Sequence, residues 1–200
     1  MTFYKKRERF ENFSIKIGNF FNKFGLSPNQ WTIMTLIPTF IAFYFLLNAN
    51  FFLAALFFII ASFIDIIDGS VARVTESVTE LGAYLDTIMD RYVEGIIIFG
   101  LLFISLPQIF MPSYIWIFLY FFGGIMTTYA KAAAKEKNLV ETEIRGGLLE
   151  RAERLIILFI GILLAHFNPI WLSITIIILA FLTNVTAVQR IYIAIRTSKK

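Results

Sequence analysis

The chain has 200 residues with a formal net charge of +4; 58% of them are hydrophobic and 17% aromatic, including 23 Phe. A water-soluble domain of this size could not cover so much apolar surface, so the composition indicates an integral membrane protein. The absence of Cys excludes disulfide bonds, thiolate nucleophiles and thiolate metal sites, which leaves oxygen atoms and the single His as candidate metal ligands. We expect no nucleic-acid partner.

The first predicted element, residues 1–23, is an amphipathic helix lying in the cytoplasmic interface of the membrane. Its Phe and Ile residues gather near one face of the helix and its Lys and Arg residues on the other. The segment has no small-residue cleavage site and carries charges throughout, so we do not interpret it as a signal peptide. A simple basic anchor is the alternative interpretation, and the two are compatible.

Three long blocks without a charged residue follow, at residues 24–64, 95–130 and 155–189. Each is about twice the ~20 residues that a helix needs to cross a bilayer, and each is interrupted near its middle by turn-forming residues. Ser27 is a candidate N-cap and Pro28 suits the first position of the first span. We therefore predict an all-α membrane protein in which residues 24–200 form one domain of six transmembrane helices in three hairpins, over about residues 31–48, 51–74, 80–105, 113–135, 148–166 and 169–195.

The topology follows from the charges, because all 18 Lys and Arg lie outside these blocks. The positive-inside rule places both termini and both charged loops in the cytoplasm and the hairpin tips outside. Every Asp and Glu is on the cytoplasmic side as well. We predict a multi-pass protein of the cell membrane whose active site faces the cytoplasm.

Two pairs of Asp residues occupy the ends of adjacent predicted helices. Asp65 and Asp68 lie one turn apart at the end of the second span, and Asp86 and Asp90 lie one turn apart at the start of the third. The short connection makes these helices antiparallel neighbours, so the four carboxylates would share one pocket. An ionised Asp in a membrane span costs about 2.5 to 3.5 kcal/mol, so cations must compensate for the four charges.

Divalent ions fit this requirement, because Mg²⁺, Mn²⁺ and Ca²⁺ prefer oxygen ligands. Two ions would neutralise the four carboxylates and leave coordination sites for a phosphate-bearing ligand. Gly69, Ala72 and Gly82 keep the surroundings free of bulk, and Arg73 supplies a forked donor for phosphate. The alternative interpretation treats the glycines as packing residues and the Asp residues as helix caps.

The order Asp65-x2-Asp68-Gly69-x2-Ala72-Arg73-x8-Gly82-x3-Asp86-x3-Asp90 resembles the signature of the CDP-alcohol phosphatidyltransferase family, D-x2-D-G-x2-A-R-x8-G-x3-D-x3-D, with every defining position matched. The resemblance extends over most of the chain and includes Pro28-Asn29 at the start of the first span. It implies an enzyme that transfers a phosphatidyl-type group from a CDP-lipid to an alcohol and releases CMP. It also suggests a homodimer.

The resemblance assigns roles to individual residues. One or two Mg²⁺ or Mn²⁺ ions would be held by Asp65, Asp68, Asp86 and Asp90. Asp90 would also be the general base that takes the proton from the acceptor hydroxyl. The cytidine and diphosphate would be held by Asn29, Gly69, Ala72, Arg73, Thr79 and Gly82.

A second, basic cluster at the inner ends of the last three spans comprises Lys131, Arg145, Arg151, Arg154 and Arg190. Lys131, Arg151 and Arg190 border apolar helices, and convergent basic side chains suggest an acceptor that itself carries phosphate. We interpret Lys135, Lys137, Arg196, Lys199 and Lys200 as a hydrated face instead.

The sequences DRY at residues 90–92 and GLLERAERL at residues 147–155 resemble the branch of the family that uses inositol phosphate, the phosphatidylinositol phosphate and archaetidylinositol phosphate synthases. In that branch the residues corresponding to Lys131, Arg151 and Arg190 bind the acceptor's phosphate. Glycerol 3-phosphate or another alcohol is the alternative acceptor. The donor would be CDP-archaeol or CDP-diacylglycerol, and we favour the archaeal lipid.

Two other functions fit parts of the sequence. Membrane prenyltransferases also pair Asp-rich motifs around Mg²⁺, but their first motif is more widely spaced. A divalent-cation transporter would need acidic residues along a path to the outer side, where this chain has none. We expect His166 at an outer hairpin tip and leave it, with Glu94, without a role.

Overall fold

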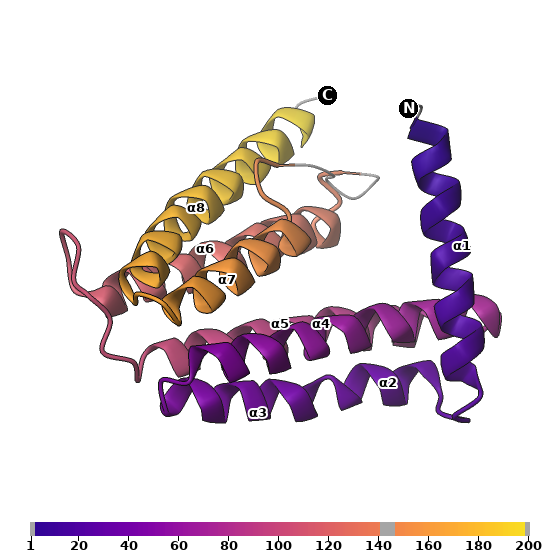
Figure 1. The fold of residues 1–200 in the computed structure, drawn as a ribbon. Coiled ribbons are helices and arrows are strands. Elements are labelled where there is room, and N and C mark those ends of the chain that lie inside the picture. The colour runs from indigo at the N-terminus through magenta and orange to yellow at the C-terminus, as the bar shows by residue number, and fades with distance from the viewer. Residues whose placement is uncertain (1–2, 141–146, 199–200) are drawn as a thin grey trace. The chain divides into compact units, whose positions relative to one another are not determined.

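The computed structural model describes residues 3–140 and 147–198, and their regular structure is α-helical apart from an isolated bridge between Ile109 and Met111. The all-α prediction is confirmed for these residues. The helices, shown in Figure 1, are α1 Phe3–Asn22, α2 Pro28–Met34, α3 Leu36–Leu47, α4 Phe51–Val74, α5 Glu80–Leu101, α6 Ser113–Glu136, α7 Arg151–Ala165 and α8 Ile170–Ser198.

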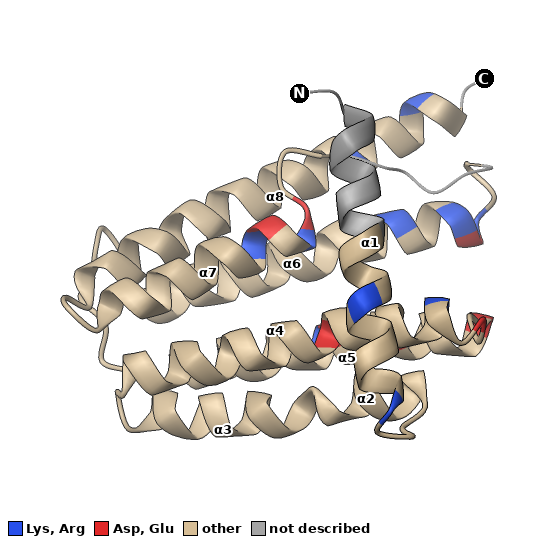
Figure 2. Ribbon diagram, turned by 45° about the vertical axis from the view of Figure 1, so that its right-hand side comes forward, with Lys and Arg blue, Asp and Glu red and all other residues tan. Residues whose placement is uncertain are grey.

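The described residues fall into two compact units. The first lies within Met1–Tyr44 and Leu56–Ile97 and contains α1, α2 and most of α3, α4 and α5. The second lies within Phe45–Ala55 and Ile98–Lys200 and contains α6, α7 and α8. Within each unit the charged residues gather toward one end of the helices, and the remaining lengths carry none (Figure 2).

In the first unit, α1 runs at a steep angle to α2, α4 and α5 (Figure 1). The prediction of an N-terminal helix is confirmed for residues 3–22; residues 1 and 2, with the side chains up to residue 11, lie outside the described part. A core cluster of Ile17, Trp31, Ile67 and Val71 joins α1 to α2 and α4. A Cβ atom on Gly18 would lie 2.9 Å from the carbonyl carbon of Ser70, so glycine permits this close crossing.

The first predicted span begins where its sequence indicates. Ser27 caps α2: its Oγ accepts from the Gln30 backbone N–H at 3.3 Å, while the Gln30 side chain accepts from the Ser27 N–H at 2.8 Å. Pro28 occupies the first helical position. The helix is interrupted at Thr35, because Pro38 has no N–H to donate to the carbonyl of Met34.

The second unit is a bundle of α6, α7 and α8 packed through small residues. A Cβ atom on Gly123 would lie 2.7 Å from Asn184 Nδ2, and one on Gly161 would lie 2.7 Å from Thr175 Cβ. Asn184 Nδ2 also donates across the helices to the carbonyl of Leu119 at 2.9 Å. Small residues with occasional interhelical hydrogen bonds are typical of packing in membranes, where the lipid offers helices no hydrophobic reason to associate.

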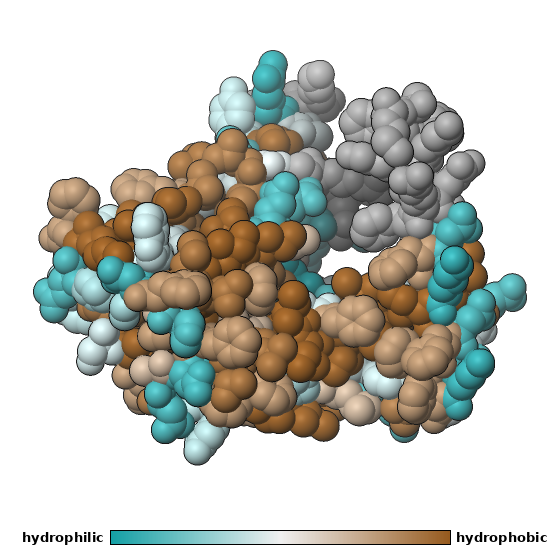
Figure 3. Space-filling view, viewed as in Figure 1, coloured by the Kyte–Doolittle hydropathy of each residue, from teal (hydrophilic) through white to brown (hydrophobic). Residues whose placement is uncertain are grey.

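Four of the described segments are long and apolar enough to cross a membrane, namely Pro28–Leu47, Phe51–Val74, Ser113–Glu136 and Ile170–Ser198. Large apolar side chains also cover much of the visible surface (Figure 3), and Phe40, for example, is 56% exposed. Both observations indicate a membrane protein. Two predicted spans do not meet the same standard. α5 carries charged residues from Glu80 to Glu94, and α7, with 15 residues, is only about 22 Å long against a ~30 Å hydrocarbon core.

Candidate functional site

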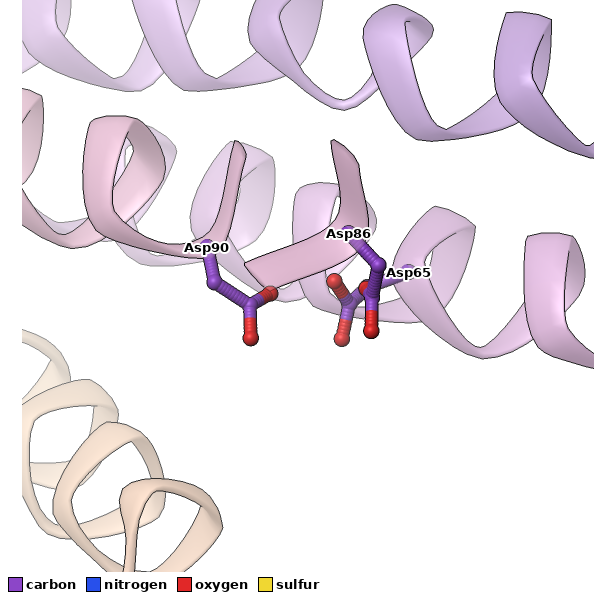
Figure 4. Close-up of side chains that lie close together, drawn as sticks. All are labelled: Asp65, Asp86 and Asp90. Atoms are coloured by element: carbon purple, nitrogen blue, oxygen red, sulfur yellow. The ribbon is translucent and has the colours of Figure 1, made fainter. Parts of the chain in front are cut away.

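Three carboxylates meet in the first unit. Asp65 comes from α4, and Asp86 and Asp90 come from successive turns of α5; one oxygen of each lies within 4.8 Å of the others. Figure 4 shows the three side chains turned toward the same side of their helices. The three residues are half-buried, so water and ions can reach them. The helical spacing of α5 and its short connection to α4 are sufficient to produce this group.

Asp68 takes a different position from the one expected of a fourth member. Its side chain is buried, and its Oδ2 accepts a hydrogen bond of 2.6 Å from Thr32 Oγ1 on α2. Its other oxygen accepts from the Gly69 backbone N–H. Asp68 is therefore turned toward α2, outside the group of three. Sequence reasoning missed Thr32, although its position three residues after Asn29 on the same helical face was a usable signal.

The donor set fits a divalent cation. Asp65, Asp86 and Asp90 each supply a carboxylate oxygen, and closely grouped oxygens are what Mg²⁺ and Mn²⁺ prefer. Such ions would also relieve the repulsion among the carboxylates, which lie on helices of mainly apolar sequence.

A cavity of about 270 Å³ lies in the same unit between α2, α4 and α5. Asp68 and Asp86 line it on the acidic side. The other lining residues include all those that the family resemblance assigns to the nucleotide: Asn29, Gly69, Ala72, Arg73, Thr79 and Gly82. The tertiary structure thus brings residues from three helices and a loop to one cavity.

Gly82 keeps part of this cavity open. A Cβ atom at this position would lie 3.1 Å from Thr79 Oγ1 and 3.2 Å from Asn29 Oδ1, which is closer than ordinary contacts. The Gly82 N–H donates to Thr79 Oγ1 at 3.0 Å and so fixes that hydroxyl at the start of α5. A side chain at residue 82 would push apart the two polar groups that face each other there.

Arg73 is held by the N-terminal helix. Its Nε and Nη2 donate to Ser14 Oγ on α1 at 3.1 and 2.6 Å, and Nη2 also lies 3.3 Å from Ser70 Oγ. The two serine hydroxyls are themselves 2.9 Å apart and buried. α1 therefore contributes to the cavity indirectly, by orienting an arginine that lines it. Nothing in the sequence pattern distinguishes Ser14 from other polar residues of this helix.

Glu94 and His166, to which the sequence assigned no role, each make defined contacts in the structure. Glu94 is buried and accepts a hydrogen bond of 2.6 Å from Arg91 Nη1, so the two form an ion pair one turn apart on α5. His166 ends α7 in the second unit, with its ring centroid 5.9 Å from that of Phe52. His166 is thus in contact with aromatic residues at a hairpin tip.

The basic residues belong to the second unit. Lys131 on α6, Arg151 at the start of α7 and Arg190 on α8 are half-buried, whereas Lys135, Lys137 and Arg196 are exposed. Arg190 Nη1 donates to the carbonyl of Thr127 at 2.9 Å. Arg154, which was grouped with them only by its place in the sequence, is buried in the bundle. Arg145, Lys199 and Lys200 lie outside the described residues.

Comparison with protein families matches residues 26–189 to the model of CDP-alcohol phosphatidyltransferases. The archaetidylinositol phosphate synthase of Pyrococcus horikoshii is 33% identical over 177 residues, which are 88% of this chain and 88% of that protein. The phosphatidylinositol phosphate synthase of Mycolicibacterium smegmatis is 35% identical over 147 residues, 71% of this chain and 63% of that protein.

Solved structures of the Mycobacterium tuberculosis phosphatidylinositol phosphate synthase have the same fold. The structure with CDP-DAG bound aligns with a TM-score of 0.80 at 28% identity, over 90% of this chain and 92% of that one. A second structure of that protein, in complex with manganese and citrate, aligns with a TM-score of 0.80 over 94% of this chain and 89% of that one.

Proposed function

The chain belongs to the CDP-alcohol phosphatidyltransferase family and is an enzyme of phospholipid biosynthesis, and from this premise we propose that it transfers the phosphatidyl-type group of a CDP-lipid to a hydroxyl of myo-inositol phosphate. The products are the lipid-linked inositol phosphate and CMP. The observation that carries this proposal is the cavity of the first unit, which is lined by the expected nucleotide residues and shares Asp86 with the carboxylate group.

The carboxylates would hold one or two Mg²⁺ or Mn²⁺ ions, with Asp68 joining Asp65, Asp86 and Asp90 as a ligand. The manganese in the M. tuberculosis enzyme's structure supports this choice of metal. Bound ions would offset the charge of the diphosphate and stabilise the leaving CMP. Thr32 would orient Asp68 through the 2.6 Å hydrogen bond that the two side chains make.

The chain's own polar groups perform the remaining tasks. Arg73, held by Ser14, donates N–H groups to the diphosphate or the cytosine carbonyl. Asn29 and Thr79, which face each other across Gly82, bind the nucleotide. Asp90 takes the proton from the acceptor hydroxyl as that oxygen attacks phosphorus, so the alkoxide never has to form in water.

The acceptor's phosphate would bind to Lys131, Arg151 and Arg190. The names of the P. horikoshii and M. smegmatis relatives, both inositol phosphate enzymes, support this acceptor. CDP-archaeol is the proposed donor, because the P. horikoshii relative matches 88% of both chains. CDP-diacylglycerol is the alternative donor, since the M. tuberculosis enzyme binds it.

The proposed setting is the cell membrane, with six spans in three hairpins, cytoplasmic termini and a cytoplasmic active site. In this arrangement α5 and α7 are the two spans beyond the four apolar segments, and the charged N-terminal part of α5 lies toward the cytoplasmic side. Residues 1–23 lie in the interface, residues 24–200 form the catalytic domain, and the enzyme is a homodimer.

The direct test is the release of CMP from purified enzyme in detergent with Mg²⁺ and either CDP-lipid. We expect myo-inositol phosphate to support turnover better than glycerol 3-phosphate, serine or unphosphorylated myo-inositol. A chelator should stop turnover, and added Mn²⁺ should restore it. Absence of CMP with every acceptor would overturn the proposal. Turnover with glycerol 3-phosphate alone would show that glycerol 3-phosphate, and not myo-inositol phosphate, is the acceptor.

The acceptor site is tested separately by Lys131→Ala and Arg151→Ala. Each should raise KM for myo-inositol phosphate by about tenfold or more and change KM for the CDP-lipid little, because a hydrogen bond to a charged group is lost from one substrate only. Lys135→Ala, an exposed lysine one turn beyond Lys131, is the matched control. Equal acceptor KM values in all three variants and the wild type would remove these residues from the site.

A further inference from the structure

Thr127 on α6 binds one arginine from each of the other two helices of its unit. Its Oγ1 accepts a hydrogen bond of 2.8 Å from Arg154 Nη1 on α7, and its carbonyl oxygen accepts one of 2.9 Å from Arg190 Nη1 on α8. Thr127 is 1% exposed. A single buried threonine thus connects two basic residues that are 36 positions apart in the chain.

The hydroxyl of Thr127 has a fixed orientation. Oγ1 donates its one proton to the carbonyl of Gly124 at 2.7 Å, so its lone pairs are left to accept from Arg154. The contact with Arg190 uses the backbone, which side-chain substitution at residue 127 leaves in place. Removing the hydroxyl therefore affects Arg154 and leaves the contact with Arg190 in place.

Arg154 is an unusual residue to bury, being 2% exposed. Taking a guanidinium group out of water is costly unless its N–H donors are bonded and its charge interacts with an anion. Arg154 lies one turn after Arg151, on the same face of α7. A cation fixed at low dielectric acts more strongly on a nearby anion than an exposed lysine does.

The loop before α7 connects this pair to Arg190. Leu149 N–H donates to Thr186 Oγ1 on α8 at 3.2 Å, and a Cβ atom on Gly147 would lie 3.6 Å from Arg190 Nε. The segment that leads into Arg151 therefore lies against the helix turn that carries Arg190. Thr127 on α6 thus contacts Arg154 on α7 and Arg190 on α8, and the loop that precedes Arg151 packs against α8.

We propose that Thr127 and Arg154 extend the acceptor-phosphate site. Thr127 is a positioning residue that fixes the orientation of Arg154 and, through the backbone, of Arg190. The buried charge of Arg154 increases the preference for a phosphorylated acceptor over the same polyol without phosphate. This inference rests on the proposed binding of the acceptor's phosphate by Lys131, Arg151 and Arg190.

The test is Thr127→Val, which removes the hydroxyl and keeps the shape of the side chain. We expect KM for myo-inositol phosphate to rise about tenfold, the loss of one hydrogen bond to a charged group, while kcat and KM for the CDP-lipid change less than about twofold. Thr127→Ser keeps the hydroxyl and should restore the wild-type KM. Thr197→Val, at an exposed threonine whose hydroxyl donates within α8 to the carbonyl of Ile193 at 2.9 Å, is the control and should have no effect.

A purely structural role for Thr127 would give a different result. Thr127→Val would then lower the Tm and the amount of active enzyme, with both KM values unchanged, and this outcome overturns the inference. Failure of Thr127→Ser to restore the acceptor KM overturns it as well. Should Thr127→Val not fold, Thr127→Ala removes the same hydroxyl with less crowding and carries the same expectations.

Failure of the inference and failure of the proposed function are distinguishable. If Lys131→Ala and Arg151→Ala raise the acceptor KM but Thr127→Val does not, only the role of Thr127 is refuted. If those two variants have no effect, the acceptor site itself is wrong. Arg154→Lys, which keeps the charge but loses the fork that bonds Thr127, should give the same acceptor-specific rise in KM as Thr127→Val.

Discussion

Replacing Ser14 by Ala tests whether the N-terminal helix holds in place Arg73, a residue of the cavity proposed to bind the nucleotide. In the structure, Ser14 Oγ accepts from Arg73 Nε at 3.1 Å and from Nη2 at 2.6 Å. In the variant, Arg73 keeps the longer contact of 3.3 Å with Ser70 Oγ. The guanidinium group would then rotate more freely, and the CDP-lipid would have to immobilise it on binding.

The magnitude follows from the bonds lost. A hydrogen bond to a charged group contributes about 1.5 to 3 kcal/mol. The lower end applies here, because Ser70 remains and water can reach the cavity that Arg73 lines. About 1.4 kcal/mol corresponds to a tenfold change in an equilibrium constant. We therefore expect KM for the CDP-lipid to rise about tenfold, with KM for myo-inositol phosphate nearly unchanged.

The assay is CMP release at saturating myo-inositol phosphate and varied CDP-lipid. Asn19→Ala, at an exposed position of the same helix, is the control and should match the wild type. Combining Ser14→Ala with Arg73→Lys completes a double-mutant cycle: if Ser14 acts through Arg73, Ser14→Ala should change KM less than about twofold when residue 73 is already Lys. An unchanged KM for the CDP-lipid, or fully additive effects, would refute the reasoning.

Three further substitutions test other parts of the structure. Asp90→Asn should lower kcat at least about 100-fold, because it removes the proposed general base, while equilibrium binding of the CDP-lipid stays measurable; retained turnover would end that assignment. Gly82→Ala should raise KM for the CDP-lipid several-fold, since the added Cβ would lie 3.1 Å from Thr79 Oγ1 and 3.2 Å from Asn29 Oδ1. A wild-type KM would show that these two side chains can move aside without weakening the binding of the CDP-lipid. Gly161→Val should lower the Tm in detergent by crowding Thr175, at a cost of about 1 to 3 kcal/mol, and an unaltered Tm would argue against close packing of α7 on α8.

Helix positions were predicted best where charge and turn residues mark both ends. The range 51–74 equals α4, because it starts after Asn50 and ends in a polar turn. Helix boundaries were predicted less accurately where a proline or a capping residue sets the end of a helix. The first span is interrupted at Thr35 by the missing N–H of Pro38, and α7 starts at Arg151 because Glu150 and Glu153 form its capping box.

For the candidate site, too, some relations between residues were predictable from the sequence and others were not. By itself the sequence determined that Asp86 and Asp90 share a face and that Asp65 and Asp68 end the preceding helix, because these relations depend only on the helical repeat. It also identified the three charge-free blocks, which depend only on the order of the residues. Only the tertiary structure decided that Thr32 binds Asp68, that Ser14 holds Arg73, and that Thr127 binds Arg154. These partners are 36, 59 and 27 residues apart, so their contacts depend on how separate helices pack, which no local pattern encodes.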